Sequence, residues 1–567
     1  MGVHKARPVT TGGGEAPQRL TLLWGATLLL ALAAPLALWS SRVPGVGELD
    51  YLIFYRLLFF NDLTASAAML GGLALATLIR PVRRIAAHLA SAASARPMHA
   101  AGVAFVLLAV CALIVYQRFP LAMDEYAPVL QARIFASGEL TAQYPVELLD
   151  YMVPPGFQGY FVLANPETGH VASAYWPGLA LLMTPFALMG AEWLLNPLLG
   201  ALGLLLLGDL SARASGRPEA RGWAMLAALA SPQYTVSAIS FYAMTGVLTF
   251  NLLFVWLLLR PGTKWAFLAG VAGSVALTMH NPLPHALVAA ACMPWLIFQP
   301  ERRRALLAII AGYLPLAAIL GLGWPLLTSE LGMRAHGLAT DLGFFSGWMQ
   351  KFRDMLVWPS IEMLRLRSYA AWKMLIWSAP GLLLVAFLAR PRTAVLRLFL
   401  VGFLVTYIFY FFVPFDQGHG WGFRYIHPAW GFLPVAAGVF AACGGPKARA
   451  FVACAIAGGL IATPVFMQQT HRTIASSISL QPEGSKEGHG ILLVTYQQHL
   501  YTGDLVRNYP SDFPDRIMML STGSSDHDAE LVASIAPDAE LMHADHRGAA
   551  WQASEKQIEE QHTRAAE

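Results

Sequence analysis

The chain has 567 residues, of which 56% are hydrophobic and only 13% are charged. Soluble domains carry about 25% charged residues, so this composition, with a mean hydropathy of +0.51, excludes an ordinary soluble protein and predicts an integral membrane protein. The net charge of +4 gives no indication of a nucleic-acid partner.

The apolar runs predict about thirteen transmembrane crossings, because a helix needs about 20 apolar residues to span the bilayer. In chain order, they lie near residues 20–40, 58–79, 101–118, 193–211, 221–238, 241–259, 264–280, 283–299, 304–327, 375–389, 395–414, 426–443 and 448–467. The first run is interpreted as a retained anchor, because the core of a cleaved signal peptide is usually shorter. Prolines interrupt the shorter run 176–190, which is predicted to be a re-entrant or interfacial helix.

The positive charges predict the orientation of these crossings, because cytoplasmic loops are enriched in lysine and arginine. A cytoplasmic N-terminal segment, residues 1–19, places clusters such as Arg302, Arg303 and Arg304 in the cytoplasm as well. The transmembrane module then comprises residues 20–467. Its opposite face, the periplasmic face in a bacterial inner membrane, carries the outer loops 119–175, 328–374 and 415–425 and the C-terminal segment 468–567.

The C-terminal segment carries more acidic than basic residues. Its stretches GILLVTY and RIMMLS are typical of short strands, with helical stretches between them. The last dozen residues have a composition typical of disorder. The predicted fold class is therefore an all-α polytopic membrane protein with outer juxtamembrane helices and a small C-terminal α/β appendage.

Two adjacent carboxylates, Asp124 and Glu125, follow the third predicted crossing in the stretch RFPLAMDEYAPVLQARIFASGEL. Asp124 is suited to cap a helix over residues 125–137, which Gly138 would end. Tyr126 and the residues four and eight positions later form an apolar stripe, so this helix is predicted to lie flat at the outer surface. One interpretation gives both acids only a capping and dipole role, and the other places them in a functional site.

Three further outer segments contain aromatic, proline or ionisable residues, and loops held by a rigid scaffold often carry function. The first two are proline-rich, and the third begins a helix. Their notable residues are Pro155 and Gly156 in YMVPPGF, Tyr175 and Trp176 in YWPGL, and Asp416, His419, Trp421, Arg424, Tyr425 and His427 in DQGHGWGFRYIHP.

Two interpretations stay open for the last of these segments. Its aromatic residues are typical of the interfacial belt, and Arg424 either reaches lipid headgroups or binds an anion. His280 and His285, in TMHNPLPH, are only a weak indication of a metal site. The predicted crossings contain almost no ionisable residues, which favours chemistry at the membrane surface over proton-coupled transport.

In their order along the chain, these segments resemble the GT-C superfamily of membrane glycosyltransferases. MDEYAPVLQARIFASGEL resembles the acidic loop of that superfamily. YWPGLALLMTPFALMG and GWGFRYIHP resemble the branch with protein O-mannosyltransferase-like enzymes, the lipid A aminoarabinose transferase and the lipopolysaccharide-core galacturonosyltransferases. The resemblance covers about residues 100–445; the two crossings before the acidic loop and the acidic C-terminal segment depart from it.

The resemblance implies a sugar donor on a polyprenyl phosphate, inversion at the anomeric carbon, and a general base in the acidic loop. That role falls on Asp124, with Glu125 as an orienting or second acid. Fixed positive charge would stabilise the departing phosphate, and neither a metal nor another cofactor is required. The candidate donor-binding residues are Arg424, Tyr425, His419 and His280, with Lys351, Arg353, Arg365 and Arg367 as unranked additions; the candidate substrate-loop residues are Tyr126, Pro155, Gly156, Tyr175 and Trp176.

The sequence therefore predicts an inner-membrane glycosyltransferase that acts on an envelope lipid, glycan or protein in the periplasm. Two other classes stay open: a transporter or flippase for polyprenyl-linked glycans or lipids, and an inactive assembly partner.

Overall fold

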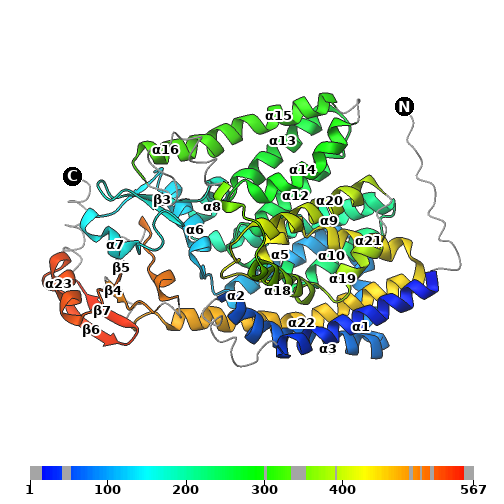
Figure 1. The fold of residues 1–567 in the computed structure, drawn as a ribbon, viewed down its shortest axis with the longest axis horizontal. Coiled ribbons are helices and arrows are strands. Elements are labelled where there is room, and N and C mark those ends of the chain that lie inside the picture. The colour runs from blue at the N-terminus through cyan, green and yellow to red at the C-terminus, as the bar shows by residue number, and fades with distance from the viewer. Residues whose placement is uncertain are drawn as a thin grey trace.

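A computed structural model describes residues 16–40, 53–298, 303–333, 353–389, 393–483, 490–497, 501–510 and 516–553. Helices form most of it, and a small sheet lies near the C-terminal end (Figure 1). Seven helical stretches of the described chain are long and apolar enough to cross a membrane. The predicted class, a helical multi-pass membrane protein with a small C-terminal α/β region, is confirmed.

Five of the seven stretches are made mainly by one helix each, and the other two contain a π-helical turn. The stretches are Leu20–Ser40 in α1 (Ala16–Ser40), Ile53–Leu78 across α2 (Ile53–Arg56), η2 (Leu57–Asp62) and α3 (Leu63–Leu78), Pro97–Ile114 (α5), Glu192–Ser215 in η4 (Glu192–Leu194) and α9 (Leu195–Ser215), Arg303–Glu330 across α15 (Arg303–Leu316), η7 (Ala317–Gly323) and α16 (Trp324–Glu330), Ala394–Phe412 in α20 (Ala394–Phe409) and η8 (Tyr410–Phe412), and Gly445–Ser479 (α22).

Seven of the predicted crossings therefore contain a long apolar helix, and the remaining ones contain shorter helices. An eighth is a pair of segments, Pro232–Ile239 and Met244–Leu258, bent by 113°. The other helices at predicted crossings are α10 (Ala220–Leu229), α13 (Thr263–Thr278), α14 (Leu283–Ile297), α19 (Leu382–Leu388) and α21 (Phe432–Cys443).

One helix begins inside a predicted outer loop. α18 (Ile361–Trp377) starts where the Ser360 side chain accepts a hydrogen bond from the Met363 N–H at 3.2 Å. The prediction placed residues 328–374 in a loop because this stretch is rich in charged residues. Two of these, Arg367 and Lys373, are buried with polar partners, so their charge does not prevent helix packing. Residues 334–352 of the predicted loop lie outside the described residues.

The C-terminal region forms a four-stranded sheet in the order β5-β4-β7-β6. The predicted strands are confirmed as β4 (Gly490–Val494) and β5 (Arg516–Leu520), which pair in parallel. The hairpin of β6 (Glu540–Asp545) and β7 (Gly548–Gln552) was not predicted, because most of β6 is exposed and polar residues interrupt its apolar pattern. α23 (Ser525–Ile535) completes this domain, and the predicted disordered end, residues 556–567, lies outside the described residues.

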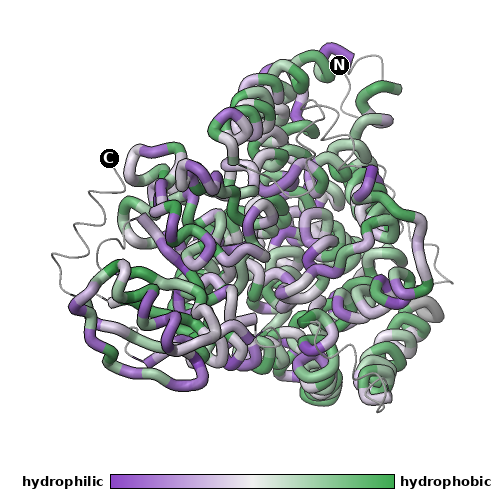
Figure 2. Tube along the Cα trace, turned by 60° about the vertical axis from the view of Figure 1, so that its left-hand side comes forward, coloured by the Kyte–Doolittle hydropathy of each residue, from purple (hydrophilic) through white to green (hydrophobic). Residues whose placement is uncertain are grey.

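The C-terminal domain begins later than predicted and is not a separate appendage. α22 continues past the predicted boundary at 467 to Ser479 and ends beside the sheet (Figure 1). Leu130 and Ile134 of α6 (Met123–Ala136) share one buried core with Ile491 of β4 and Met519 of β5. The apolar stripe of α6 therefore packs against this domain instead of facing lipid. In Figure 2, hydrophobic and hydrophilic segments alternate along this domain, whereas long runs of the helices are hydrophobic.

The outer loop 119–175 is ordered around α6. It contains the small antiparallel sheet of β1 (Ala142–Gln143), β3 (His170–Ser173) and β2 (Val162–Ala164). The next helix, α8 (Gly178–Ala187), is about 15 Å long at 1.5 Å per residue, which agrees with the prediction of a short helix that does not cross the membrane. These elements and the C-terminal domain lie at the same end of the molecule (Figure 1).

Candidate active site

Asp124 does not cap its helix but pairs with a residue 300 positions away. α6 begins at Met123 and its N-cap is Ala122, so the capping interpretation is wrong. Asp124 Oδ2 lies 2.6 Å from Nη1 of Arg424. Its other oxygen, Oδ1, accepts a hydrogen bond from the Tyr175 hydroxyl group. The sequence pattern predicted that Asp124 accepts hydrogen bonds from backbone N–H groups at the start of its helix. Asp124 pairs instead with side chains from distant parts of the chain.

The neighbouring Glu125 is fully buried, and protein groups occupy both of its carboxylate oxygens. It accepts hydrogen bonds from the Leu121 N–H at 2.6 Å and the Phe241 N–H at 2.8 Å. The Tyr116 hydroxyl group donates to it at 2.9 Å, and burial raises the pKa of Glu125 to about 7 despite these donors. The geometry therefore fits a residue that fixes the start of α6 and leaves Asp124 as the accessible acid of the pair.

The loop that carries Arg424 has a defined shape. Gly422 has a φ of +64°, and a Cβ atom there would lie 2.0 Å from Gln233 Oε1. The same Gln233 oxygen accepts a hydrogen bond from the Phe423 N–H at 2.8 Å, and Gln417 Oε1 accepts one from the Arg424 N–H at 2.8 Å. Only glycine permits this close approach. The Gly418 N–H donates to Asp416 Oδ1 at 2.7 Å, so this backbone donor is already paired.

Two of the five N–H groups of the Arg424 guanidinium donate hydrogen bonds to described residues. Nη1 binds Asp124, Nη2 donates to the Gln417 carbonyl oxygen at 2.5 Å, and the group lies 4.7 Å from the ring centroid of Tyr242. The Nε atom is buried and has no hydrogen-bond partner among the described residues. Buried donors are normally paired, so a reserved N–H beside an accessible carboxylate is suited to an incoming anion.

Asp124 is ionised at neutral pH in this arrangement. Burial by itself raises the pKa of the Asp124 carboxyl group, but the charge of Arg424 and the Tyr175 hydrogen bond outweigh burial, so the pKa lies below its ordinary value. The Asp124 side chain is 16% exposed and the Arg424 side chain 11%. The pair is therefore shielded but not sealed from ligands.

The structure places two predicted histidines around this pair. The His280 ring lies 4.1 Å from the ring of Tyr175, and burial lowers the pKa of His280 to about 4. His419 lies on the Arg424 loop, with Nε2 3.6 Å from Asp504 Oδ2. His285, in contrast, contacts Asn251 and Tyr313 between other helices. The two histidines of TMHNPLPH therefore do not share a site.

Tyr425 has a supporting position. Its hydroxyl group donates to the Asp416 carbonyl oxygen at 2.5 Å, and its ring stacks on Tyr410 with the centroids 4.5 Å apart. Tyr410 packs with Phe409 and Leu356, which line an apolar groove of about 250 Å³. The groove is lined by Leu356, Val357, Trp358, Phe409 and Phe412.

Other predicted substrate-loop residues lie elsewhere. The Tyr126 hydroxyl group donates to the Asn508 carbonyl oxygen at 2.6 Å, in the C-terminal domain. The Trp176 ring lies beside Gly321 of η7. Pro155 and Gly156 form an exposed turn, and no contact among the described residues joins them to the Asp124–Arg424 pair.

The basic residues of the predicted loop 328–374 divide into three groups. The Arg367 guanidinium group is buried and donates to the carbonyl oxygens of Tyr410, Val413 and Phe415 at 2.6–2.8 Å, so backbone carbonyl groups and not a phosphate are its partners in the structure. Arg353 and Arg365 are exposed. Lys351 lies outside the described residues.

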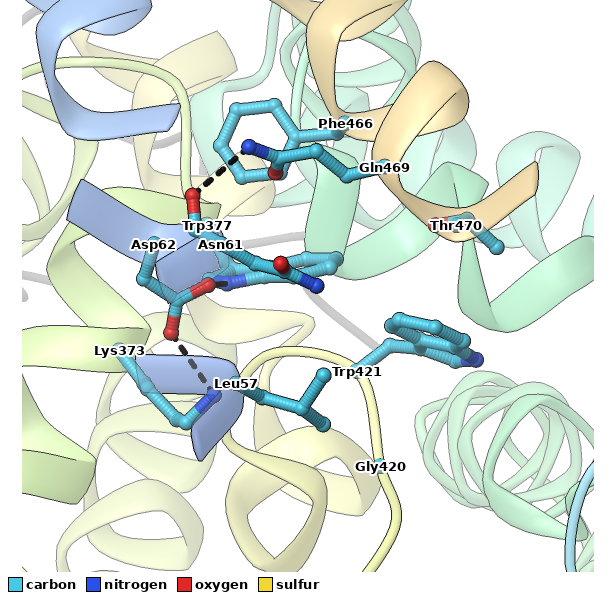
Figure 3. Close-up of a pocket in the computed structure, with 10 residues that line it drawn as sticks. All are labelled: Leu57, Asn61, Asp62, Lys373, Trp377, Gly420, Trp421, Phe466, Gln469 and Thr470. Carbon is cyan, nitrogen blue, oxygen red and sulfur yellow. Dashed lines mark hydrogen bonds and ion pairs between the residues drawn. The ribbon is translucent and has the colours of Figure 1, made fainter. Parts of the chain in front are cut away.

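A buried ion pair lies behind the Arg424 loop, on the side of Gly420 and Trp421 (Figure 3). Lys373 Nζ lies 2.7 Å from Asp62 Oδ2, and the Trp377 indole N–H donates to Asp62 Oδ1 at 2.8 Å. Asp62 lies inside a predicted crossing, so the near-absence of ionisable residues there has this exception. The space between these side chains does not admit a water molecule, which favours a link between η2 and α18 over a ligand site.

Sequence reasoning missed three residues of the site: Tyr242, Gln417 and Asp504. Tyr242 and Gln417 have no distinguishing local pattern. Asp504 likewise stands in no recognisable motif, in the stretch YTGDLVRNY. The C-terminal segment was predicted to be an appendage, and its sequence does not indicate that it contacts the Arg424 loop.

The sequence matches no protein-family model and no curated protein. Among solved structures, the fold is similar to ArnT from Cupriavidus metallidurans bound to undecaprenyl phosphate, with 16% identity and a TM-score of 0.47. The apo state of that protein gives 14% identity and the same TM-score. In both comparisons, the match covers 79% of this chain and 97% of the other chain.

Proposed function

We propose that this chain is a membrane glycosyltransferase of the GT-C type. It would transfer a hexose or pentose from a polyprenyl-phosphate donor to an envelope lipid, glycan or protein at the periplasmic face of the inner membrane. The observation that carries this proposal is the 2.6 Å contact between Asp124 and Arg424. It joins a carboxylate suited to activate a hydroxyl group and a cation suited to stabilise a phosphate.

Asp124 acts as the general base in this proposal. An acceptor hydroxyl group attacks the anomeric carbon of the sugar and transfers its proton to the Asp124 carboxylate. The bond from that carbon to the phosphate oxygen breaks, and its electron pair leaves with the polyprenyl phosphate. Attack from the side opposite the leaving group inverts the anomeric centre. A carboxylate has about four acceptor positions, so Asp124 retains capacity for the hydroxyl group beside its two present partners.

Arg424 links donor binding to activation of this base. The phosphate accepts a hydrogen bond from the free Nε of Arg424 and draws part of the guanidinium charge away from Asp124. The pKa of Asp124 then rises, which makes the carboxylate a stronger base only after the donor has bound. The apolar groove supports a path for the polyprenyl chain, because two of its lining residues, Phe409 and Leu356, pack in one cluster with Tyr410 and Tyr425, and Tyr425 follows Arg424 in the chain.

Mass spectrometry of envelope lipids and glycans tests the function. A strain that lacks the gene is expected to lose one sugar from one envelope component. Purified protein in lipid nanodiscs is expected to transfer that sugar from a lipid-linked donor to the component extracted from this strain. Movement of a labelled polyprenyl-linked sugar between leaflets without a new glycosidic bond would instead identify a transporter. Absence of both activities would identify an inactive partner.

Tyr175→Phe is expected to move the acidic limb of the pH profile of transfer to higher pH by about one unit, because a hydrogen bond to a charged group contributes about 1.5–3 kcal/mol. The lost hydroxyl group normally stabilises the ionised form of Asp124. Its removal raises the pKa of Asp124, so the loss of activity on acidification should begin at a higher pH. The measurement is the pH profile of the transfer rate.

Tyr160→Phe is the matched control, because Tyr160 lies in the same outer loop with a 52% exposed side chain. It should retain the wild-type rate and pH profile. An unchanged acidic limb in Tyr175→Phe would contradict the role of this hydrogen bond.

A further inference from the structure

A segment of the C-terminal domain, residues 501–510, reaches the candidate active site. It carries Asp504 in the short helix η11 (Thr502–Leu505). The Asp504 side chain is 11% exposed and the His419 side chain 12%, with Oδ2 and Nε2 3.6 Å apart. Burial raises the pKa of the Asp504 carboxyl group to about 7, and the charge of Asp124 adds to this rise. The C-terminal domain therefore forms one wall of the site.

Residues 501–510 contact the chain both before and after Asp124. Arg507 Nη2 donates to the Leu121 carbonyl oxygen at 3.1 Å, just before α6. Asn508 exchanges two hydrogen bonds with the Tyr126 hydroxyl group, at 2.6 and 3.1 Å. Contacts at Leu121 and Tyr126 fix the position of Asp504 relative to Asp124.

His419 and Asp504 have unused hydrogen-bonding capacity. Neither ring nitrogen of His419 has a hydrogen-bond partner in the described part of the chain. Their 3.6 Å separation is too long for a hydrogen bond between the two side chains. The Tyr501 ring lies 4.9 Å from the His419 ring and limits its movement. A buried polar group without a partner is destabilising, so this arrangement favours a ligand that supplies the missing partners.

We propose that Asp504 and His419 form a saccharide-binding subsite, in which they hydrogen-bond hydroxyl groups of a sugar placed beside Asp124. The inference rests on the proposed function, and the sugar belongs either to the donor or to the acceptor. A hydroxyl group donates to the Asp504 carboxylate, and a second one pairs with a ring nitrogen of His419. Burial lowers the pKa of His419 to about 4, so the neutral ring can accept as well as donate.

The subsite is tested with the full chain in lipid nanodiscs and two probes: undecaprenyl phosphate alone and undecaprenyl phosphate linked to a hexose or a pentose. The sugar-linked lipid should bind the wild type more tightly than the bare lipid. Asp504→Ala should weaken binding of the sugar-linked lipid about 10-fold and leave binding of the bare lipid unchanged. Asp526→Asn, an exposed position in the same domain, is the control and should change neither affinity.

The two possible sources of the sugar give different results. An Asp504→Ala variant that keeps its affinity for the donor but shows about a 10-fold higher KM for the acceptor would place the acceptor sugar in the subsite. An equal loss for both lipid probes would indicate a structural role and overturn the proposal. Unchanged donor affinity together with an unchanged acceptor KM would also overturn it.

These outcomes are distinct from failure of the proposed function. In one outcome, the protein binds the sugar-linked lipid through Asp504 and yet forms no glycosidic bond. That result would support the proposed subsite and contradict the proposed transferase function. If Asp504→Ala transfers the sugar and binds both lipid probes as the wild type does, the result would support the proposed transferase function and contradict the proposed subsite.

Discussion

Asp124→Asn is expected to lower the transfer rate by a factor of about 10² to 10⁴, the usual contribution of a general base. Asparagine has nearly the same shape, and its oxygen can still accept the Tyr175 hydrogen bond. It cannot take the proton of the attacking hydroxyl group, however, and it does not balance the charge of Arg424. The purified variant should still insert in the membrane, with an unfolding temperature somewhat below that of the wild type because the charge of Arg424 is left uncompensated, while its turnover is lost.

Asp150→Asn is the control for this substitution, because Asp150 is an exposed aspartate in the same outer loop. It should transfer sugar at the wild-type rate. Full transfer by well-folded Asp124→Asn would remove Asp124 from the role of base.

Arg424→Met is expected to lower transfer by a factor of about 10² to 10³, as observed when a group that stabilises transition-state charge is removed. It should also weaken binding of undecaprenyl phosphate itself, because the free Nε donor and the guanidinium charge are both lost. Asp124→Asn should retain this binding, since Arg424 is then freed from its carboxylate partner. Equilibrium binding of the bare lipid therefore separates the two roles.

Arg472→Met serves as the control, because it removes an exposed arginine near the C-terminal end of α22 that is not among the candidate donor-binding residues. Arg424→Lys should recover part of the lipid affinity but not the full rate, because lysine lacks the planar set of donors. Wild-type affinity of Arg424→Met for the bare lipid would show that the phosphate binds elsewhere.

Sequence reasoning identified Asp124 and Arg424 because ionisable residues stand out in an apolar chain. It did not predict their contact, since no local pattern encodes a pairing across 300 residues. The local rule for Asp124 even gave a wrong result: aspartate favours helix N-caps, but an arginine and a tyrosine offer this carboxylate stronger partners. Glu125 was equally visible in the sequence, yet its three hydrogen-bond donors could only be found in three dimensions.

For the fold, too, sequence patterns located single elements but not the contacts between distant parts of the chain. Apolar runs located the membrane helices, and β-branched and aliphatic runs located β4 and β5. The start of α18 was missed because charge was read as exposure, whereas Lys373 is neutralised by Asp62 inside the protein. The role of the C-terminal segment was missed because its contacts with α6 join residues that are distant in the chain, such as Tyr126 and Asn508.

That last contact also sets an order of events during biosynthesis. Asn508 lies 382 residues after Tyr126, so a ribosome that adds about 5–20 residues per second needs roughly 20–75 s between them. During this interval, the helices that carry Asp124 and Arg424 can already be in the bilayer, but the wall that Asp504 provides has not been synthesised. A nascent protein without its C-terminal domain would therefore occupy the membrane with an incomplete site, and the site would be completed only when that domain has been made and has folded.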